Sequence, residues 1–565
     1  MRSHAFHLSL ALALLCLTSL AGAAETVDLV IRDGVIYDGS GALPVRGGVA
    51  VRDGRVVATG VLADYSGNQE VNANGLAIAP GFINMLSWAP DTLIYDGRGV
   101  SDIKQGVTLE VFGEGDSYGP VNAQLREEML KTQADIRFDI TWTTLGEYLE
   151  FLVSKGVSPN VASFVGATTV RAHELGFEDR APTAAELRRM QDLVRQAMRE
   201  GALGVGSSLI YAPASYAKTD ELVALAKAAG EFGGGYISHM RSEGDRLLEA
   251  LDELIHIARE ANVHAQVYHL KAAGEKNWQK MPQAIAKIEA ARAQGLEITA
   301  NMYTYTAGAT GLDAAMPPWV QEGGIDSWIA RLQDAGTRER VLREMREPAD
   351  GWESLYQAAG SPERILVVGF KNEKLKPLTG KTLAEVARMR GVSPEDAAID
   401  LVIEDRTRVG TVYFLMSEEN VKLGLSQPWV SIGSDAGGPA PEGTFLLSNP
   451  HPRAYGTFAR LLGHYVREQK ITTLQDAIRR MTRLPAQTFN LKDRGCLDAG
   501  CYADIVIFDP AKIQDHATFE KPHQYATGVQ HVFVNGVQVL RDGEHTGAKP
   551  GQVVRGPGWV GWKKE

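Results

Sequence analysis

Two stretches, Gly235-Tyr-Ile-Ser-His-Met-Arg241 and Val263-His-Ala-Gln-Val-Tyr-His-Leu-Lys271, decide the fold class of this chain. Each is a short apolar run of strand length that ends in polar residues. A helical pattern over residues 247–261 separates them. A (β/α) barrel presents the ends of its parallel strands to one face. His239 and His269 stand at such ends, and two neutral imidazoles there form half of a zinc site.

The middle of the chain alternates strand and helix patterns. One helix begins with the capping box Thr183-Ala-Ala-Glu186 and closes at Gly201. The alternation predicts an α/β fold, a (β/α)8 TIM-like barrel over residues 80–487. Its eight strands are expected at 77–85, 107–114, 161–167, 202–208, 236–241, 265–270, 298–303 and 429–435.

The interval from about 310 to 427 is too long for a βα loop. It therefore predicts an inserted subdomain, with an extra strand at 365–368.

Both ends of the chain read as short strands with tight turns. Asp53-Gly54 and Asn535-Gly536 are strong hairpin signals. We expect residues 24–79 and 488–565 to form one small composite β-sandwich domain. Two independent sheets are the alternative.

Composition and the first residues restrict the partners and the compartment. A chain of 565 residues is too long for a single small hydrophobic core. The net charge of −11 argues against nucleic acid as a partner. Residues 1–23 carry Arg2, a short apolar run and Ala21-Gly-Ala23, the pattern of a secretory signal peptide. We expect cleavage after Ala23, a periplasmic or secreted product, and no membrane insertion after cleavage.

Two cysteines then remain, Cys496 and Cys501, on either side of a predicted hairpin loop. In an oxidising compartment they can pair as a disulfide. Two free thiols are the alternative, and the sequence leaves both open.

Eight short motifs occur in one order along the chain. They are Ala79-Pro-Gly-Phe-Ile83, Gln105-Gly-Val-Thr108, Ser238-His-Met-Arg241, Tyr268-His-Leu-Lys271, Tyr303-Thr-Tyr305, Gly433-Ser-Asp435, His451-Pro-Arg453 and Ala503-Asp504. In these motifs the chain resembles the amidohydrolase superfamily, and within it the D-aminoacylase (N-acyl-D-amino-acid deacylase) group, over nearly the whole mature chain. The resemblance implies a metal-containing barrel that hydrolyses the amide bond of a small N-acyl-D-amino acid.

One segment departs from that family pattern. After Pro-Gly-Phe-Ile the superfamily usually continues Asp-x-His-x-His, whereas this chain has Asn84-Met-Leu-Ser-Trp88. Leu86 and Trp88 occupy the two histidine positions, and neither side chain binds a metal. The metal position that this pair normally holds is therefore expected to be empty or absent.

The resemblance assigns the remaining metal ligands. His239 and His269 match family ligands, and Glu114 lies within one residue of the cysteine that often serves as the third. Glu110 is a rival on the same strand face but lies about 13 Å deeper. We therefore expect one Zn²⁺ per chain, or another divalent ion, held by Glu114, His239 and His269. An ion pair between Glu114 and Arg241 is the alternative structural role, and no lysine stands out as a carboxylated metal ligand.

The resemblance also assigns the chemistry. Asp435 matches the general base, and Tyr303 is expected to stabilise the oxyanion or bind the substrate carboxylate. Arg453 and Lys271 are the expected carboxylate binders, with Tyr305 and Arg241 as further candidates. The predicted function is metal-dependent hydrolysis of N-acyl-D-amino acids or similar small amides. A dipeptidase or cyclic-amide hydrolase on the same site, and a non-catalytic degenerate barrel, are the alternatives.

Overall fold

The structure is a computed structural model that describes residues 24–347 and 351–562. The predicted signal peptide at 1–23 lies outside these residues. Within them, every helix is too short or too polar to cross a bilayer.

The centre of the molecule is built on two parallel sheets. One has six strands in the order β18-β13-β12-β11-β10-β9, and the other has three, β6-β7-β8. Their bounds are β6 (Phe82–Asn84), β7 (Val107–Phe112), β8 (Asn160–Ser163), β9 (Val165–Gly166), β10 (Gly204–Ser208), β11 (Gly235–His239), β12 (Ala265–Val267), β13 (Ile298–Met302) and β18 (Val430–Ile432).

Backbone hydrogen bonds connect these two sheets at both edges. Met85 N–H donates to the Ile432 carbonyl, and Asp435 N–H donates to the Leu86 carbonyl. At the other edge Leu203, just before β10, donates its N–H to the carbonyl of Ser163 at the end of β8. The strand ends of both sheets therefore face a common region.

Each predicted strand segment contains a strand, but the bounds need correction. Residues 77–85 hold two strands of different sheets, β5 (Ala77–Pro80) and β6, and residues 161–167 likewise hold parts of β8 and β9. Strands β11 and β12 also end earlier than expected, at His239 and Val267. His269 has φ +32°, and its N–H bonds to the Asn301 side chain instead of continuing a ladder.

Helices follow the strands and pack on their neighbours in chain order. They include α5 (Ala167–Leu175), α6 (Ala184–Arg199), α7 (Thr219–Gly230), α8 (Leu247–Ala261) and α9 (Met281–Ala293). Helix α6 has the predicted capping box, and α8 spans the predicted range. The other central helices are α1 (Pro90–Tyr95), α2 (Val100–Ile103), α3 (Ala123–Thr132), α4 (Leu145–Lys155), α15 (Glu418–Leu425), α16 (Arg453–Arg460), α17 (Leu474–Met481) and α18 (Arg483–Thr488).

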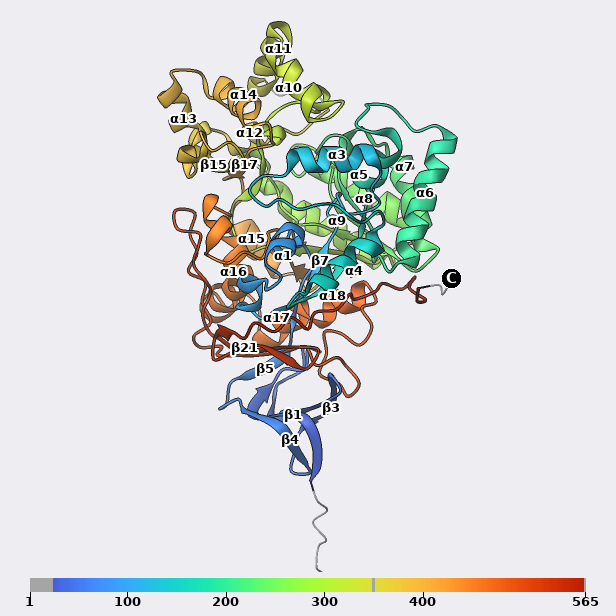
Figure 1. The fold of residues 1–565 in the computed structure, drawn as a ribbon, viewed down its shortest axis with the longest axis vertical. Helices are drawn as coiled ribbons and strands as arrows, with labels where there is room; N and C mark the ends of the chain where they lie inside the picture. The colour runs from blue at the N-terminus through green and yellow to red at the C-terminus, as the bar shows by residue number, and fades with distance from the viewer. Residues whose placement is uncertain (1–23, 348–350, 563–565) are drawn as a thin grey trace, which may run out of the picture.

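Strands from both ends of the chain join in one nine-stranded sheet (Figure 1). The strands are β1 (Glu25–Ile36), β2 (Val45–Arg52), β3 (Arg55–Gly60), β4 (Tyr65–Asn72), β5, β19 (Ile505–Phe508), β20 (Val529–Val534), β21 (Val537–Arg541) and β22 (Glu544–His545). The antiparallel β5–β19 pair, with Ile78 opposite Ile507, connects the two ends. The hairpin turns form at Asp53-Gly54 and Asn535-Gly536, and Cys496 and Cys501 form a disulfide.

The long interval after β13 forms a separate layer. A four-stranded antiparallel sheet of β14 (Gly308–Gly311), β17 (Gly410–Tyr413), β15 (Ile365–Gly369) and β16 (Lys381–Thr382) is covered by helices. These are α10 (Ile325–Gln333), α11 (Ala335–Arg346), α12 (Leu355–Ala359), α13 (Leu383–Arg390) and α14 (Pro394–Asp405). Figure 1 shows this layer at the end of the molecule opposite the terminal sheet.

Candidate metal centre

Three ligand-type side chains converge from three strands. His239 is the last residue of β11, His269 follows β12, and Glu114 follows β7. Oε1 of Glu114 lies 3.2 Å from Nδ1 of His239 and 2.7 Å from Nε2 of His269. All three side chains are buried. Burial alone would raise the pKa of Glu114, but the two imidazoles lower it well below its usual range. Glu114 is therefore a carboxylate.

These residues fit a divalent metal. Two ligands bound at about 2 Å to a tetrahedral ion lie roughly 3.3 Å apart. The ligand atoms of this group all lie within 4.8 Å of one another, so small side-chain shifts suffice. The rival Glu110 does not belong to this group, and its carboxylate accepts a hydrogen bond from the Asn84 side chain at 2.9 Å instead. Burial raises the pKa of Glu110 to about 7.

Glu243 orients the two histidines through contacts separate from those of Glu114. Its Oε1 lies 2.9 Å from Nδ1 of His269 and 2.6 Å from the Lys271 ammonium, and its Oε2 lies 3.5 Å from Nε2 of His239. The Lys271 nitrogen is also 2.7 Å from Nδ1 of His269. We assign the proton to Nδ1 of His269, donated to Glu243, because this leaves Nε2 free for a metal. The sequence did not identify Glu243, because this residue lies in a loop without helix or strand periodicity.

The two residues that replace the family histidines contribute in different ways. Leu86 is fully buried in the apolar core. Trp88 donates its indole N–H to Oε2 of Glu114 at 2.7 Å. Oε2 thus accepts a hydrogen bond, whereas Oε1 lies beside both imidazoles and is the oxygen better placed for a metal.

Asp435 and Arg453 lie together in the same cavity. Asp435 follows β18 with φ +52°, and its Oδ2 is 2.9 Å from Nη1 of Arg453. The Arg453 guanidinium also donates to the Ala309 carbonyl at 3.2 Å and stacks on Tyr303, 4.6 Å from the ring centre. Burial raises the pKa of Asp435, and Arg453 opposes that shift. Asp435 is thus a carboxyl group that accepts a proton more readily than an exposed aspartate does.

The cavity has a volume of about 670 Å³ and gathers most of the predicted site. Its lining includes Trp88, Glu114, His239, Glu243, His269, Lys271, Tyr303, Asp435 and Arg453. The Tyr303 hydroxyl contacts the Met416 sulfur at 3.4 Å.

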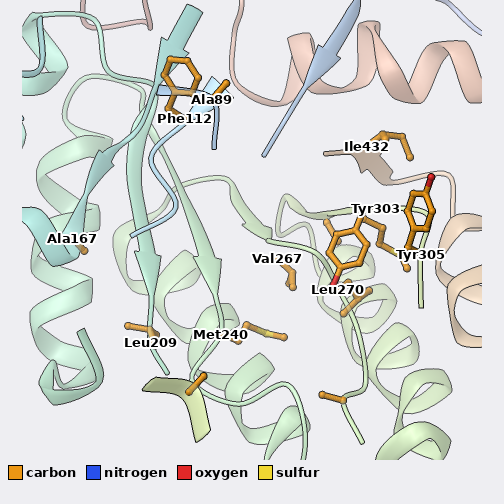
Figure 2. Close-up of a cluster of buried hydrophobic side chains, with 14 of the residues drawn as sticks. Ala89, Phe112, Ala167, Leu209, Met240, Val267, Leu270, Tyr303, Tyr305 and Ile432 are labelled. Carbon is orange, nitrogen blue, oxygen red and sulfur yellow. The ribbon is translucent and has the colours of Figure 1, made fainter. Parts of the chain in front are cut away.

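Two predicted substrate-binding residues do not line this cavity. The Arg241 guanidinium binds Glu253 at 2.9 Å and the carbonyls of Ser215 and Ala217. This pairing also replaces the alternative ion pair with Glu114. The Tyr305 hydroxyl donates to Asp515 at 3.1 Å. Figure 2 shows the hydroxyls of Tyr303 and Tyr305 pointing to different sides of the apolar cluster. Their motifs predicted the strands correctly, but not the side chains that bind them, which are Glu253 in α8 and Asp515.

Comparisons with known proteins show what the whole chain is similar to. The amidohydrolase family model matches residues 151–540. The chain is 33% identical to the D-aminoacylase of Alcaligenes xylosoxydans xylosoxydans over 94% of its own length and 98% of that protein. A crystal structure of N-acyl-D-glutamate deacylase from Bordetella bronchiseptica, with zinc and a phosphonate inhibitor, has a TM-score of 0.77 and 30% identity, covering 94% of this chain and 100% of that one. A D-aminoacylase structure described as having a binuclear metal centre has a TM-score of 0.77, 31% identity and the same coverage.

Metal affinity is expected to depend on pH through His269. Burial and Lys271 lower the pKa of His269, but Glu243 and Glu114 raise it further, to about 9. Below about pH 9 a metal must therefore displace a proton from this imidazole. We predict that the zinc dissociation constant falls about tenfold per pH unit between roughly pH 6 and 8, with about one proton released. Competition with a chromophoric chelator measures this slope, and a flat profile would contradict it.

The indole of Trp88 is expected to strengthen metal binding by holding Glu114. Trp88→Phe keeps the ring but removes the N–H, so zinc affinity should fall about 10- to 100-fold. Trp278→Phe is the matched control, because its indole N–H binds the Leu415 carbonyl at 3.1 Å, outside the ligand set. Equilibrium dialysis with metal analysis compares the variants. Equal affinities in Trp88→Phe and wild type would refute this role.

Proposed function

Since this chain belongs to the amidohydrolase family, we propose that it hydrolyses the amide bond of N-acyl-D-amino acids with a single divalent ion, zinc, bound by Glu114, His239 and His269. The chain is a hydrolase of carbon–nitrogen bonds other than peptide bonds, and its relatives act on small acyl-amino acids. The observation that carries the proposal is the approach of Glu114 to both imidazoles in a cavity that also contains Asp435.

We interpret the two parallel sheets as one (β/α)8 barrel. Their edges are linked by backbone hydrogen bonds, and the site residues follow the carboxyl ends of β7, β11, β12, β13 and β18. Active sites of such barrels lie at that face. The inserted layer of β14–β17 stands next to it and contributes cavity residues. The terminal sheet lies away from it and is proposed as a separate β domain with boundaries near residues 79 and 487.

A divalent ion held by Glu114, His239 and His269 would act as a Lewis acid towards the amide carbonyl and would acidify the attacking water. Asp435 would accept a proton from the attacking water as general base and return it to the departing amine as general acid. Its raised pKa suits the second role, because a more basic carboxylate holds the proton until the C–N bond breaks. Glu243 keeps His269 in the correct tautomer through the contact at Nδ1.

The α-carboxylate of the substrate is proposed to bind at Tyr303, Lys271 and Arg453. Tyr303 has the most available donor. Among the described residues its hydroxyl contacts only the Met416 sulfur, which is a weak acceptor. Lys271 and Arg453 are already paired with Glu243 and Asp435. A substrate carboxylate would therefore bind to cationic side chains that already form ion pairs, and not to unpaired ones. The Arg453–Asp435 contact also places the carboxylate subsite beside the proton acceptor.

A single metal follows from the replaced histidine pair. Trp88 donates its indole N–H to Oε2 of Glu114 and Leu86 has an aliphatic side chain, so neither position would supply a ligand for a second ion. A binuclear centre is described for a D-aminoacylase relative, and we propose that this chain holds one ion instead.

Replacing Asp435 should remove catalysis and leave the metal in place. Asp435→Asn is expected to lower kcat about 10²- to 10⁴-fold with unchanged zinc content. In the wild type, activity should rise with pH as Asp435 loses its proton, at a pH above that of an ordinary aspartate because its pKa is raised. The assay compares N-acyl-D- and N-acyl-L-amino acids, dipeptides and hydantoins. Preference for dipeptides or cyclic amides, or no turnover of any amide, would overturn the proposal.

We also propose that the protein is exported and cleaved after Ala23. The leader pattern at 1–23 and the Cys496–Cys501 disulfide support an oxidising compartment. Expression with the leader in a Gram-negative host should give a periplasmic protein beginning at Ala24, whose cysteines resist alkylation until they are reduced. A cytosolic protein with residues 1–23 retained and two free thiols would disprove export.

A further inference from the structure

We propose that Arg408 forms an anion subsite on the wall of the catalytic cavity and selects substrates with an acidic side chain, such as N-acyl-D-glutamate or N-acyl-D-aspartate. This inference rests on the proposed function and specifies its substrate class. It is carried by the anchoring of the Arg408 guanidinium, by its open edge towards the cavity, and by its distance from the metal ligands.

Contacts on one edge hold the Arg408 side chain in place. Its Nε donates to Oδ2 of Asp313 at 2.8 Å, and its Nη2 donates to Oγ1 of Thr310 at 3.0 Å. The guanidinium carbon lies 4.8 Å from the centre of the Tyr211 ring. Asp313 is itself buried. Arg408 is thus an oriented group, unlike a mobile surface arginine.

The opposite edge of this guanidinium is open. The Arg408 side chain is 49% exposed, although it lines the cavity. Within residues 24–347 and 351–562, Nη1 has no hydrogen-bond partner. Lys271 and Arg453, the other lysine and arginine of the described cavity wall, are only 5% and 3% exposed and carry ion pairs. Arg408 therefore has unused, coplanar N–H groups, which suit two oxygens of one carboxylate.

The position of Arg408 suits a substrate side chain. The Tyr211 ring also packs edge-on against His239, with ring centres 5.3 Å apart. Adding this distance to the 4.8 Å between Tyr211 and Arg408 places the guanidinium at most about 10 Å from His239. The proposed α-carboxylate subsite lies on β12, β13 and α16, whereas Tyr211 follows β10. A dicarboxylate thus meets a separate cation at each end.

Asp116 provides a test of whether the subsite binds an anionic or a cationic side chain. It is an exposed aspartate that lines the same cavity as Arg408. Its carboxylate competes with an acidic substrate for Arg408. Removing this charge by Asp116→Asn should lower KM for acidic substrates, whereas a subsite for a cationic side chain would lose affinity.

The experiment measures kcat and KM of the zinc-loaded enzyme for N-acetyl-D-glutamate, N-acetyl-D-aspartate and N-acetyl-D-leucine. The wild type should prefer an acidic substrate over the leucine derivative. In Arg408→Met the acidic-to-neutral ratio of kcat/KM should fall about 10- to 100-fold, mainly through KM, as expected for loss of a charge-assisted contact. Arg408→Lys should recover part of the ratio, because it restores the charge without the planar fork.

Arg406→Met is the matched control. Arg406 lies in the same loop but pairs with Asp326, and it does not line the cavity. Its ratio should match that of the wild type, and zinc content should be equal in all variants. Wild-type preference for the leucine derivative, or an unchanged ratio in both Arg408 variants, would overturn the subsite but leave the proposed function. Inactivity of the wild type on every N-acyl-D-amino acid would instead overturn the proposed function. If Arg408→Met fails to fold, Arg408→Lys and Asp116→Asn decide the question.

Discussion

The carboxylate of Glu114 between two imidazoles is the contact on which the rest of the centre depends. A buried carboxylate is costly unless cations or hydrogen-bond donors surround it. Here His239 and His269 approach one oxygen, and Trp88 donates to the other. Beyond His269, Glu243 and then Lys271 continue an alternation of acidic and basic groups. Without metal, a protonated imidazole balances the charge, and a divalent ion takes over that role by displacing the proton.

The sequence predicted the framework well because periodicity and strand ends are local signals. The helix Leu247–Ala261 and the strand at residues 365–368 lie where their patterns placed them. Glu114 lies beside the two histidines and Glu110 does not, because four residues of extended chain separate the two carboxyls. The Cys496–Cys501 pair, left open by the sequence, is a disulfide.

The hydrogen-bond and ion-pair partners of the site residues could not be predicted from such local signals. Arg241 belongs to the motif that contains His239, yet its guanidinium binds Glu253 from α8. Tyr305 is held by Asp515, which is 210 residues away in sequence. Glu243 and Arg408 lie in loops where no periodicity marks them. The departure at Leu86 and Trp88 was visible in the sequence, but the hydrogen bond from the indole to Glu114 required the three-dimensional arrangement.

These features describe one cavity with two parts. We propose that the floor binds one ion and transfers one proton, and that the inserted layer supplies the side chain that selects the substrate. Anomalous diffraction at the zinc edge, from crystals grown with excess zinc, shows directly whether the floor holds a single ion. We expect one peak per chain, bonded to Glu114, His239 and His269, with the Trp88 indole still on Oε2. A second peak beside Leu86 and Trp88, or no peak between the two histidines, would contradict a single-ion centre.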